Sequence, residues 1–358
     1  MGPTTIMVSV GPPPIYVVHY CMLVHVARHS AREKSIRDDV RKQITRGGGT
    51  SMVMYGNALL LPSELLMNIK SLETIEFASL QRLTEIEGYF LKGCPNLKSI
   101  DLSPLVELFE VGPSFLGACT GLTVLDLQPL ANVTEIKEFF LDGCSGLKSL
   151  DLTPLSHVTE VKGYFLKGCR SLKEIDLTPL SQVTKVGWSF LCNCTGLSVV
   201  DVRPMSRVSS LGGVLLDGCS GMSTVHLPLL PNIHKVEWAL LKQCSSLKTI
   251  DLRPFSHVTE IDGAFLENCS GLISIDLTPF SRVTSIAWGF MKGCSSLKSI
   301  DLSPLSANLH RLDDFPFQHC TCLTTIDMRP LRSLSGVPQC LLGEAYRDVL
   351  LPTHLVAL

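Results

Sequence analysis

Residues 147–171 read LKSLDLTPLSHVTEVKGYFLKGCRS, and this stretch decides the fold because close copies of it fill most of the chain. Cysteine returns every 25 residues from Cys94 to Cys294, and the next cysteine of the series, Cys320, follows after 26. Columns of leucine, aspartate and phenylalanine keep the same register. Self-similarity at a fixed period of about 20–50 residues is the signature of a repeat architecture. Each copy offers one apolar face, so stacking the copies end to end buries a continuous core.

One copy divides into three short pieces. In LKSLDL the apolar residues alternate with polar ones, which is typical of a half-buried strand, and Pro154 ends this strand because proline lacks a backbone donor. The segment VTEV, residues 158–161, gives a second short extended piece. The spacing of Phe165, Leu166 and Cys169 predicts one short helical turn. Each copy is therefore expected to hold short strands and a short helical turn.

Composition excludes several classes of protein. The chain has 358 residues, of which 45% are hydrophobic and only 18% charged, with a mean hydropathy of +0.28, so it is not a disordered protein. The formal net charge of −2 gives no electrostatic footprint for nucleic acid. No run of about 18 or more apolar residues exists, which excludes a multi-pass membrane protein and predicts no transmembrane span.

The repeated pattern resembles a known family. F-L-x-G-C-x-x-L-x-x-I, preceded by V-T-x-I, is similar to the BspA-type (bacterial surface antigen type) leucine-rich repeats, over about residues 61–335. The resemblance implies a leucine-rich-repeat solenoid used for binding or adhesion, and it implies no catalytic residues. With the pieces described above, the expected fold is an α/β solenoid. It is a leucine-rich-repeat stack with short parallel strands and short helical turns, about 10–11 repeats of 25 residues plus caps.

The ends of the chain depart from the repeat. We expect a non-repeat segment at 1–50, an N-terminal cap at 51–71, the solenoid at 72–331 and a degenerate C-terminal cap at 332–358. For 1–50 a poorly packed or disordered tail is one interpretation, and an export or anchor signal around the apolar residues 15–27 is another. A weak basic helix at 28–46 is expected to be solvated, with contact to a partner or a membrane surface as the alternative.

The chain contains 14 cysteines, and their spacing favours packing over chemistry. Zinc sites need paired ligands at short spacing, whereas the column offers one cysteine per repeat. Equivalent side chains in a stack point the same way, which suits disulfides poorly. We therefore predict a spine of buried thiols acting as small hydrophobic groups, with no metal or cofactor. Such thiols favour a reducing compartment, so the expected location is the cytoplasm, with the cell surface or secretion as the alternative.

Aspartates at the same position of successive repeats repel one another, so another interaction must offset this repulsion. One explanation is that each aspartate accepts a backbone N–H from the residues after it, as in an Asx-turn. Another is the lysine three positions earlier, and the functional alternatives are an acidic partner-binding strip or a calcium site. His226 interrupts the column and Pro228 is displaced by one position, which predicts a local bend there. The column consists of Asp101, Asp126, Asp151, Asp176, Asp201, Asp251, Asp276, Asp301 and Asp327.

The only three tryptophans, Trp188, Trp238 and Trp288, share one column and alternate there with Gly213 and Gly263. The packing interpretation places each indole across the glycine of a neighbouring repeat. The functional interpretation is an aromatic binding strip with a pitch of about 10 Å, from two strand spacings. Aromatic residues are favoured at interface hot spots.

No nucleotide-binding, zinc-protease or serine-hydrolase motif occurs, so we expect no enzyme. The sequence favours a non-catalytic protein that mediates protein–protein interaction through an extended solenoid face; the partner is a protein of unknown identity. A cell-surface or secreted adhesin or antigen of the BspA-like type is the alternative, and a purely structural scaffold is a third. The candidate partner-binding residues are Trp188, Trp238, Trp288, Lys148, Lys173 and Lys248.

Overall fold

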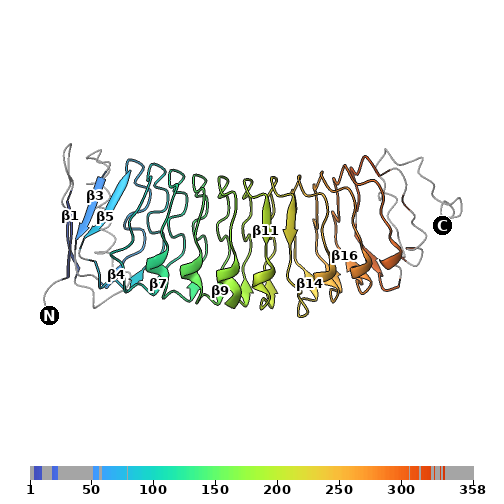
Figure 1. Ribbon diagram of the computed structural model, residues 1–358, viewed down its shortest axis with the longest axis horizontal. Coiled ribbons are helices and arrows are strands. Elements are labelled where there is room, and N and C mark those ends of the chain that lie inside the picture. Colours follow the sequence, from blue (N-terminus) through green and yellow to red (C-terminus); the bar gives the residue numbers. More distant parts are fainter. Residues whose placement is uncertain are drawn as a thin grey trace. The chain divides into compact units, whose positions relative to one another are not determined.

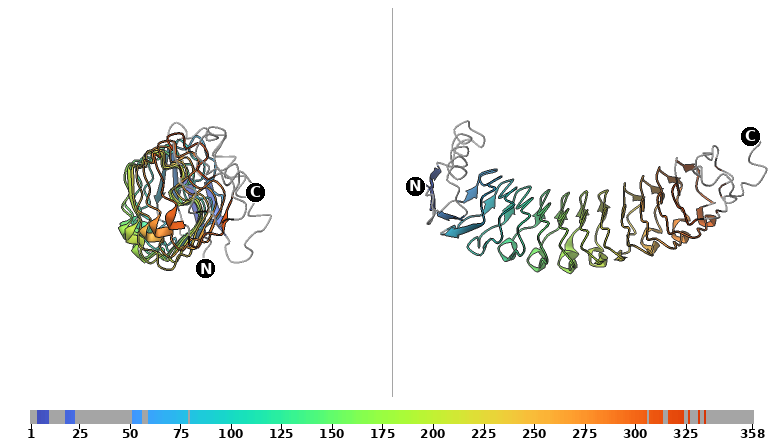
Figure 2. Two further views of the ribbon diagram at one scale, coloured as in Figure 1. Left: turned by 90° about the vertical axis from the view of Figure 1, so that its right-hand side faces the viewer. Right: turned by 90° about the horizontal axis from the view of Figure 1, so that it is seen from above.

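A computed structural model describes residues 4–9, 18–22, 51–55, 59–78, 80–305, 307–313, 316–323, 326, 331 and 334. The chain divides into two compact units, Met1–Val183 and Thr184–Leu358. Within each unit the chain winds into coils that lie parallel to one another (Figures 1 and 2). The basic helix expected at 28–46, nearly all of the C-terminal cap expected at 332–358, and Asp327 lie outside the described residues.

The first unit begins with a four-stranded sheet in the order β2-β1-β3-β5 and continues into short parallel strands, β4-β6-β7 and β8-β9. Its strands are β1 (Thr4–Ser9), β2 (Val18–Met22), β3 (Ser51–Tyr55), β4 (Leu60–Leu61), β5 (Thr74–Ala78), β6 (Glu85–Ile86), β7 (Glu110–Val111), β8 (Glu135–Ile136) and β9 (Glu160–Val161). Its 3-10 helices are η1 (Gln128–Leu130), η2 (Thr153–Leu155) and η3 (Thr178–Gln182).

The second unit pairs β10 with β12, β11 with β13, and β14-β15-β16-β17, all in parallel. Its strands are β10 (Lys185–Val186), β11 (Val199–Asp201), β12 (Ser210–Leu211), β13 (Thr224–His226), β14 (Lys235–Val236), β15 (Glu260–Ile261), β16 (Ser285–Ile286) and β17 (Arg311–Leu312). Its 3-10 helices are η4 (Arg203–Met205), η5 (Arg253–Phe255), η6 (Thr278–Phe280) and η7 (Ser303–Leu305).

The strand register confirms that one coil consumes 25 residues. Glu135 pairs with Glu160 in the first unit, and Glu260 pairs with Ser285 in the second. The next pair, Ser285 with Arg311, spans 26 residues, so the parallel strand pairing continues although this repeat is one residue longer. The chain is therefore a solenoid with short parallel strands, as the repeat predicts.

Of the two extended pieces expected in each repeat, one forms a regular strand and the other mostly does not. The V-T-x-I piece forms a regular two-residue strand in coil after coil, for example β8 and β9. Among the described residues, the L-K-S-L-D-L piece is a regular strand only in β5, β11 and β13, and residues 147–152 form no regular ladder. Most of the prolines that follow this piece lie inside 3-10 helices such as η2, where the fixed proline φ fits the first turn.

The helical turn predicted at 165–169 is wrong. Tyr164, Leu166 and Gly168 have φ of 67°, 53° and 73°, so every second residue is left-handed and no helix can form. Because the sign of φ alternates, the backbone N–H and C=O groups point toward the coils on either side and not along the chain. For example, the Leu166 N–H donates to Phe140 O of the preceding coil at 3.0 Å. The described residues contain only the short 3-10 helices given above, so the α part of the α/β assignment is not confirmed.

The core is a set of stacked columns. Phe90, Phe115 and Phe140 are almost fully buried, and their ring centroids lie 5.4 and 5.6 Å apart in near-parallel planes. Offset-stacked rings at this distance add to the hydrophobic gain of burial. The second unit resumes the same stack with Phe265 and Phe290, 5.5 Å apart. Register and core therefore depend on the same repeat.

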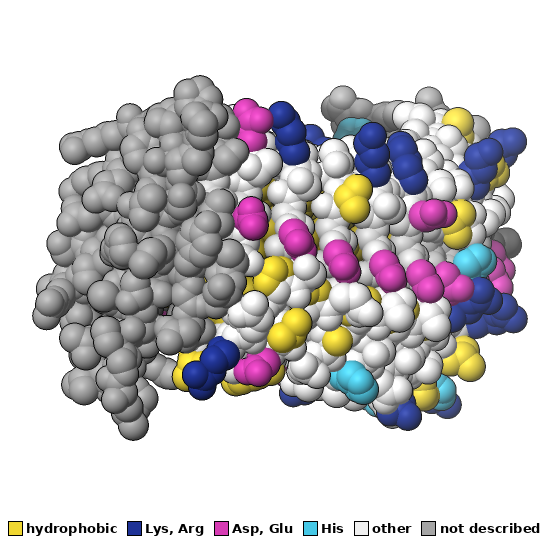
Figure 3. All heavy atoms as spheres, turned by 60° about the vertical axis from the view of Figure 1, so that its left-hand side comes forward, with side chains coloured by type: hydrophobic (Ala, Val, Ile, Leu, Met, Phe, Trp, Pro, Cys, Tyr) yellow, Lys and Arg dark blue, Asp and Glu magenta, His cyan; other side chains and the backbone are white. Residues whose placement is uncertain are grey.

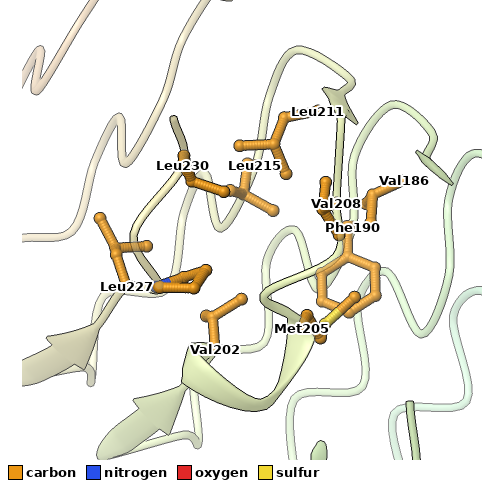
Figure 4. Close-up of a pocket in the computed structure, with 10 residues that line it drawn as sticks. Val186, Phe190, Val202, Met205, Val208, Leu211, Leu215, Leu227 and Leu230 are labelled. Atoms are coloured by element: carbon orange, nitrogen blue, oxygen red, sulfur yellow. The ribbon is translucent and has the colours of Figure 1, made fainter. Parts of the chain in front are cut away.

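The stack is interrupted where Leu215 and Leu240 replace phenylalanine. An apolar cavity of about 10 Å³ opens beside Leu215, with Phe190 and Met205 on its wall (Figure 4). The irregular repeat after His226 contributes Leu227 to the same wall, and Leu229 beyond it is 71% exposed. The smaller side chains explain the cavity, because leucine fills less volume than the ring it replaces.

Candidate interaction surfaces

The three tryptophans lie on the surface of the second unit. Trp188, Trp238 and Trp288 are 50%, 37% and 45% exposed, although tryptophan side chains are usually well buried. A Cβ atom built on Gly213 would come within 2.9 Å of the Trp188 ring, so that indole covers the glycine. The interleaved packing predicted from the sequence is present, and it leaves each ring partly exposed. We name these three residues the aromatic strip.

The pitch predicted for the aromatic strip is wrong for its second half. The rings of Trp238 and Trp288 have centroids 6.4 Å apart and planes tilted by 53°, closer than two strand spacings. Both rings lean over Gly263: a Cβ atom there would lie 2.9 Å from Trp288 Nε1 and 3.2 Å from Trp238 Cδ1. The sequence gives no direction of lean, so this convergence could not be foreseen.

Charged side chains border the converging pair. Lys235 Nζ lies 2.9 Å from Asp262 Oδ2, and Asp262 immediately precedes Gly263. The pKa of Lys235 is raised, first by its hydrogen bond to Asp262 and further by the charges of Glu237 and Glu260. A second cation, Lys242, lies over the Trp238 ring at 5.7 Å and pairs with Glu267 at 2.8 Å. The strip therefore has an apolar centre and a charged rim.

The first unit carries aromatic residues that the sequence analysis missed. Phe139 and Tyr164 stack at 4.3 Å, and Lys167 Nζ lies 5.0 Å from the Tyr164 ring centroid. Lys92 lies 5.1 Å from the Tyr89 ring in the same way. The signal was the recurring Y-F-L-K-G, in which the lysine follows three residues after the ring. These contacts are cation–π pairs on a half-exposed surface.

The candidate lysines lie on another part of each coil. Lys148, Lys173 and Lys248 are exposed, each on the L-K-S-L-D-L piece that precedes a 3-10 helix. The tryptophan column comes after that helix and after the V-T-x-I strand, as Trp288 does after η6 and β16. The structure thus brings Trp238 and Trp288 together but assigns the lysines to a separate polar strip.

The aspartate column borders the lysines and is held by Asx-turns, as predicted. Asp151 Oδ1 accepts the Thr153 backbone N–H at 2.8 Å, and the side chain and backbone of Thr153 lower the pKa of Asp151. Arg203 pairs with Asp201 at 2.6 Å, two positions along. Figure 3 shows acidic side chains in a row, with basic side chains set off to one side. The same backbone bond recurs at Asp101, Asp126, Asp176, Asp201, Asp251, Asp276 and Asp301.

The cysteine column is buried in the thiol form, and it does more than fill space. Cys269 Sγ donates to Leu241 O, 28 residues earlier, at 3.0 Å, while the Cys244 backbone N–H donates to the same oxygen at 3.4 Å. Burial raises the pKa of Cys269 to about 12, so the thiol stays protonated and is not a nucleophile at neutral pH. Among the described residues no group of three or more possible metal ligands is assembled.

Comparison with known proteins identifies the repeat. The profile of the BspA type leucine rich repeat region matches 61–172, 111–246 and 209–336. A leucine-rich repeat protein from Bacteroides ovatus is similar in structure, at 20% identity and a TM-score of 0.50, covering 80% of this chain and 82% of that one. A leucine rich cell surface protein from Faecalibacterium prausnitzii gives 17% identity, a TM-score of 0.42 and coverage of 77% and 84%. No curated protein matches in sequence.

Proposed function

Because the chain belongs to the BspA type leucine rich repeat family, we propose that it is a non-catalytic protein that binds another protein through an extended face of its coils. Such solenoids present long surfaces whose exposed positions vary while the core columns stay fixed. Here the exposed column 98–298 carries lysine, threonine, serine or isoleucine, whereas its buried neighbours are leucine or methionine. The regular core thus supports a variable surface.

The half-exposed aromatic strip is the observation that carries the proposal. A tryptophan buries about 150–250 Å² when it is fully covered, and 37–50% of each of these three residues is still exposed, so roughly half of that area or less remains for a partner to cover at each ring. Hot spots of protein interfaces are enriched in tryptophan. The glycine beneath each ring fixes its position, which lowers the entropy lost when a partner covers it.

The polar strip is the second candidate surface. Lys148, Lys173 and Lys248 are exposed, and their long side chains favour contact with an acidic partner at the rim of an interface. Such charges contribute more to the rate of association than to affinity. The strip is therefore expected to modulate binding, with the aromatic strip supplying most of the binding energy.

A protein of the cell surface or a secreted adhesin is the alternative for location. The family resemblance supports it, and nothing in the structure supports the cytoplasmic location expected from the cysteines. Within the described ranges, no helix has the length and apolar character needed to cross a bilayer. Surface labelling of intact cells, with sequencing of the mature N-terminus, separates the two: labelled protein supports the surface, and labelling only after lysis supports the cytoplasm.

Affinity capture with three matched baits tests the binding proposal. The baits are the wild type, the triple variant Trp188→Ala/Trp238→Ala/Trp288→Ala, and the triple variant Lys148→Glu/Lys173→Glu/Lys248→Glu. A Val124→Ser bait, altered at another exposed position, is the control. We expect at least one protein whose capture is lost with the tryptophan variant and retained with the control. Capture that is identical for all baits contradicts the proposal.

A further inference from the structure

The rim of the aromatic strip carries more negative than positive charge where two rings converge. Lys235 interacts with three carboxylates: it forms an ion pair with Asp262, and the negative charges of Glu237 and Glu260 also act on it. In the described part of the chain, neither of these two glutamates forms an ion pair of its own. Glu237 precedes Trp238 directly, and Glu260 lies on β15, three residues before Gly263. Two carboxylates without an ion pair of their own are therefore found near the paired indoles, although Glu260 also interacts electrostatically with Arg311.

The equivalent positions of the first unit carry a smaller surplus of negative charge. There Lys162 lies 3.2 Å from Glu135 and 2.8 Å from Glu160, and Lys137 also pairs with Glu135. Lys137 lies 3.9 Å from Glu110 as well, so three carboxylates share two ammonium groups and each of them has an ion pair. Around the paired indoles, by contrast, Lys235 has an ion pair with Asp262 only, and a ligand can supply positive charge for Glu237 and Glu260.

We propose that the aromatic strip binds an arginine-bearing basic segment of the protein partner. A guanidinium group is planar and stacks on an indole face, while its N–H groups donate to carboxylates in the same plane. Trp238 and Trp288 are 37% and 45% exposed, and Lys242 already lies over the Trp238 ring, which shows that this ring accepts a cation. Glu237, directly before Trp238, and Glu260, three residues before Gly263, offer acceptors nearby in the sequence. The inference rests on the proposed protein-binding function and adds the chemistry of the partner.

Other partners fit the strip less well. An acidic segment would meet Glu237 and Glu260, and the two lysines of the rim, Lys235 and Lys242, already pair with Asp262 and Glu267. A saccharide could stack on a flat ring, but the planes of Trp238 and Trp288 are tilted by 53°, so one sugar chain cannot lie flat on both. A lysine segment satisfies the charge but not the stacking, because its ammonium is a compact and strongly hydrated point charge.

The protein carries its own reporter for this test. All three tryptophans of the full chain belong to the aromatic strip, so intrinsic fluorescence reports on that surface alone. The full-length protein is titrated with a short alternating arginine–glycine peptide, with lysine–glycine and glutamate–glycine peptides of equal length, and with a cello-oligosaccharide. We expect a saturable change with the arginine peptide, about fivefold tighter than with the lysine peptide. Added salt weakens both.

Variants of the carboxylates complete the experiment. Glu237→Gln/Glu260→Gln is expected to weaken the arginine peptide about three- to tenfold, since each exposed charge pair contributes modestly. Glu107→Gln, at an exposed position of the other unit, is the control and leaves binding unchanged. Far-UV circular dichroism shows that the variants are folded.

Three results would overturn the inference: no fluorescence change with the arginine peptide, equal binding of the glutamate peptide, or saturation by the saccharide instead. If one of these results occurs while the wild type still captures a natural partner that the tryptophan variant does not capture, then the preference for arginine is wrong and the proposed protein-binding function stands. Capture that ignores the tryptophans refutes the proposed function itself.

Discussion

Substitution of Cys269 separates two explanations of the cysteine column. If the thiol acts only as a small hydrophobic group, serine should be worse than alanine, because serine buries a hydroxyl without a partner. The structure supplies a partner, since Leu241 O lies 3.0 Å from the sulfur. The expected order is therefore the reverse: Cys269→Ala costs more than Cys269→Ser.

The magnitude follows from what each variant removes. Alanine loses one hydrogen bond, about 0.5–1.5 kcal/mol. It also loses a buried heavy atom comparable to a methylene group, about 0.8 kcal/mol, with a further small term for the cavity. The sum is about 2 kcal/mol of unfolding free energy for Cys269→Ala. Cys269→Ser keeps a donor toward Leu241 O and should cost about 1 kcal/mol or less.

Equilibrium urea unfolding, followed by far-UV circular dichroism, measures both variants against the wild type. Cys322 is exposed, so Cys322→Ala and Cys322→Ser are matched controls that should change the unfolding free energy by less than about 0.5 kcal/mol. A serine variant less stable than the alanine variant would refute the hydrogen-bond role of the column. Equal losses at Cys269 and Cys322 would show that the column is not buried.

Three further outcomes are expected. Gly263→Val should displace both indoles that lean over this glycine and should therefore change tryptophan fluorescence. Gly117→Ala is the control, because the nearest atom to an added Cβ lies 3.5 Å away, and its spectrum should stay the same. An unchanged spectrum of Gly263→Val contradicts the packing described. Leu215→Phe should extend the ring stack into the cavity and stabilise the protein by about 1 kcal/mol in urea unfolding, and a loss would show that the cavity cannot admit a ring. The pKa of Asp151 is lowered in the folded state, as are those of Asp101, Asp201, Asp251 and Asp276, so the stability that these groups contribute is complete above about pH 4 and is lost as the pH falls through the folded value. The melting temperature should fall below about pH 4, less steeply in Asp151→Asn, and a fall that begins at neutral pH would contradict this.

The period of the chain could be predicted from sequence because one column after another repeats in register. Apolar side chains at fixed positions must face the same way in every coil, so burial of Leu147 or Cys269 follows from spacing alone. The Asx-turn at Asp151 was predictable for the same reason, since an aspartate before a turn has few other local acceptor roles.

The rest depended on geometry that spacing does not encode. The spacing of Phe165, Leu166 and Cys169 fits a helix as well as it fits alternating φ signs. The glycine or asparagine that recurs in one column, as at Gly168, Asn193 and Asn268, was the sequence signal for left-handed residues. The role of the thiol as a donor was hidden because the acceptor, a carbonyl 28 residues earlier, carries no side-chain signature.

A crystal structure of the full chain tests the central claim most directly, because that claim is that like residues lie upon like in successive coils. The predicted result is a row of sulfurs in which thiols donate to a carbonyl of an earlier coil, 28 residues back for Cys119, whose Sγ lies 3.1 Å from Leu91 O, and 29 back for Cys320. Sulfurs scattered through a compact globule, or tryptophans buried among them, would contradict it.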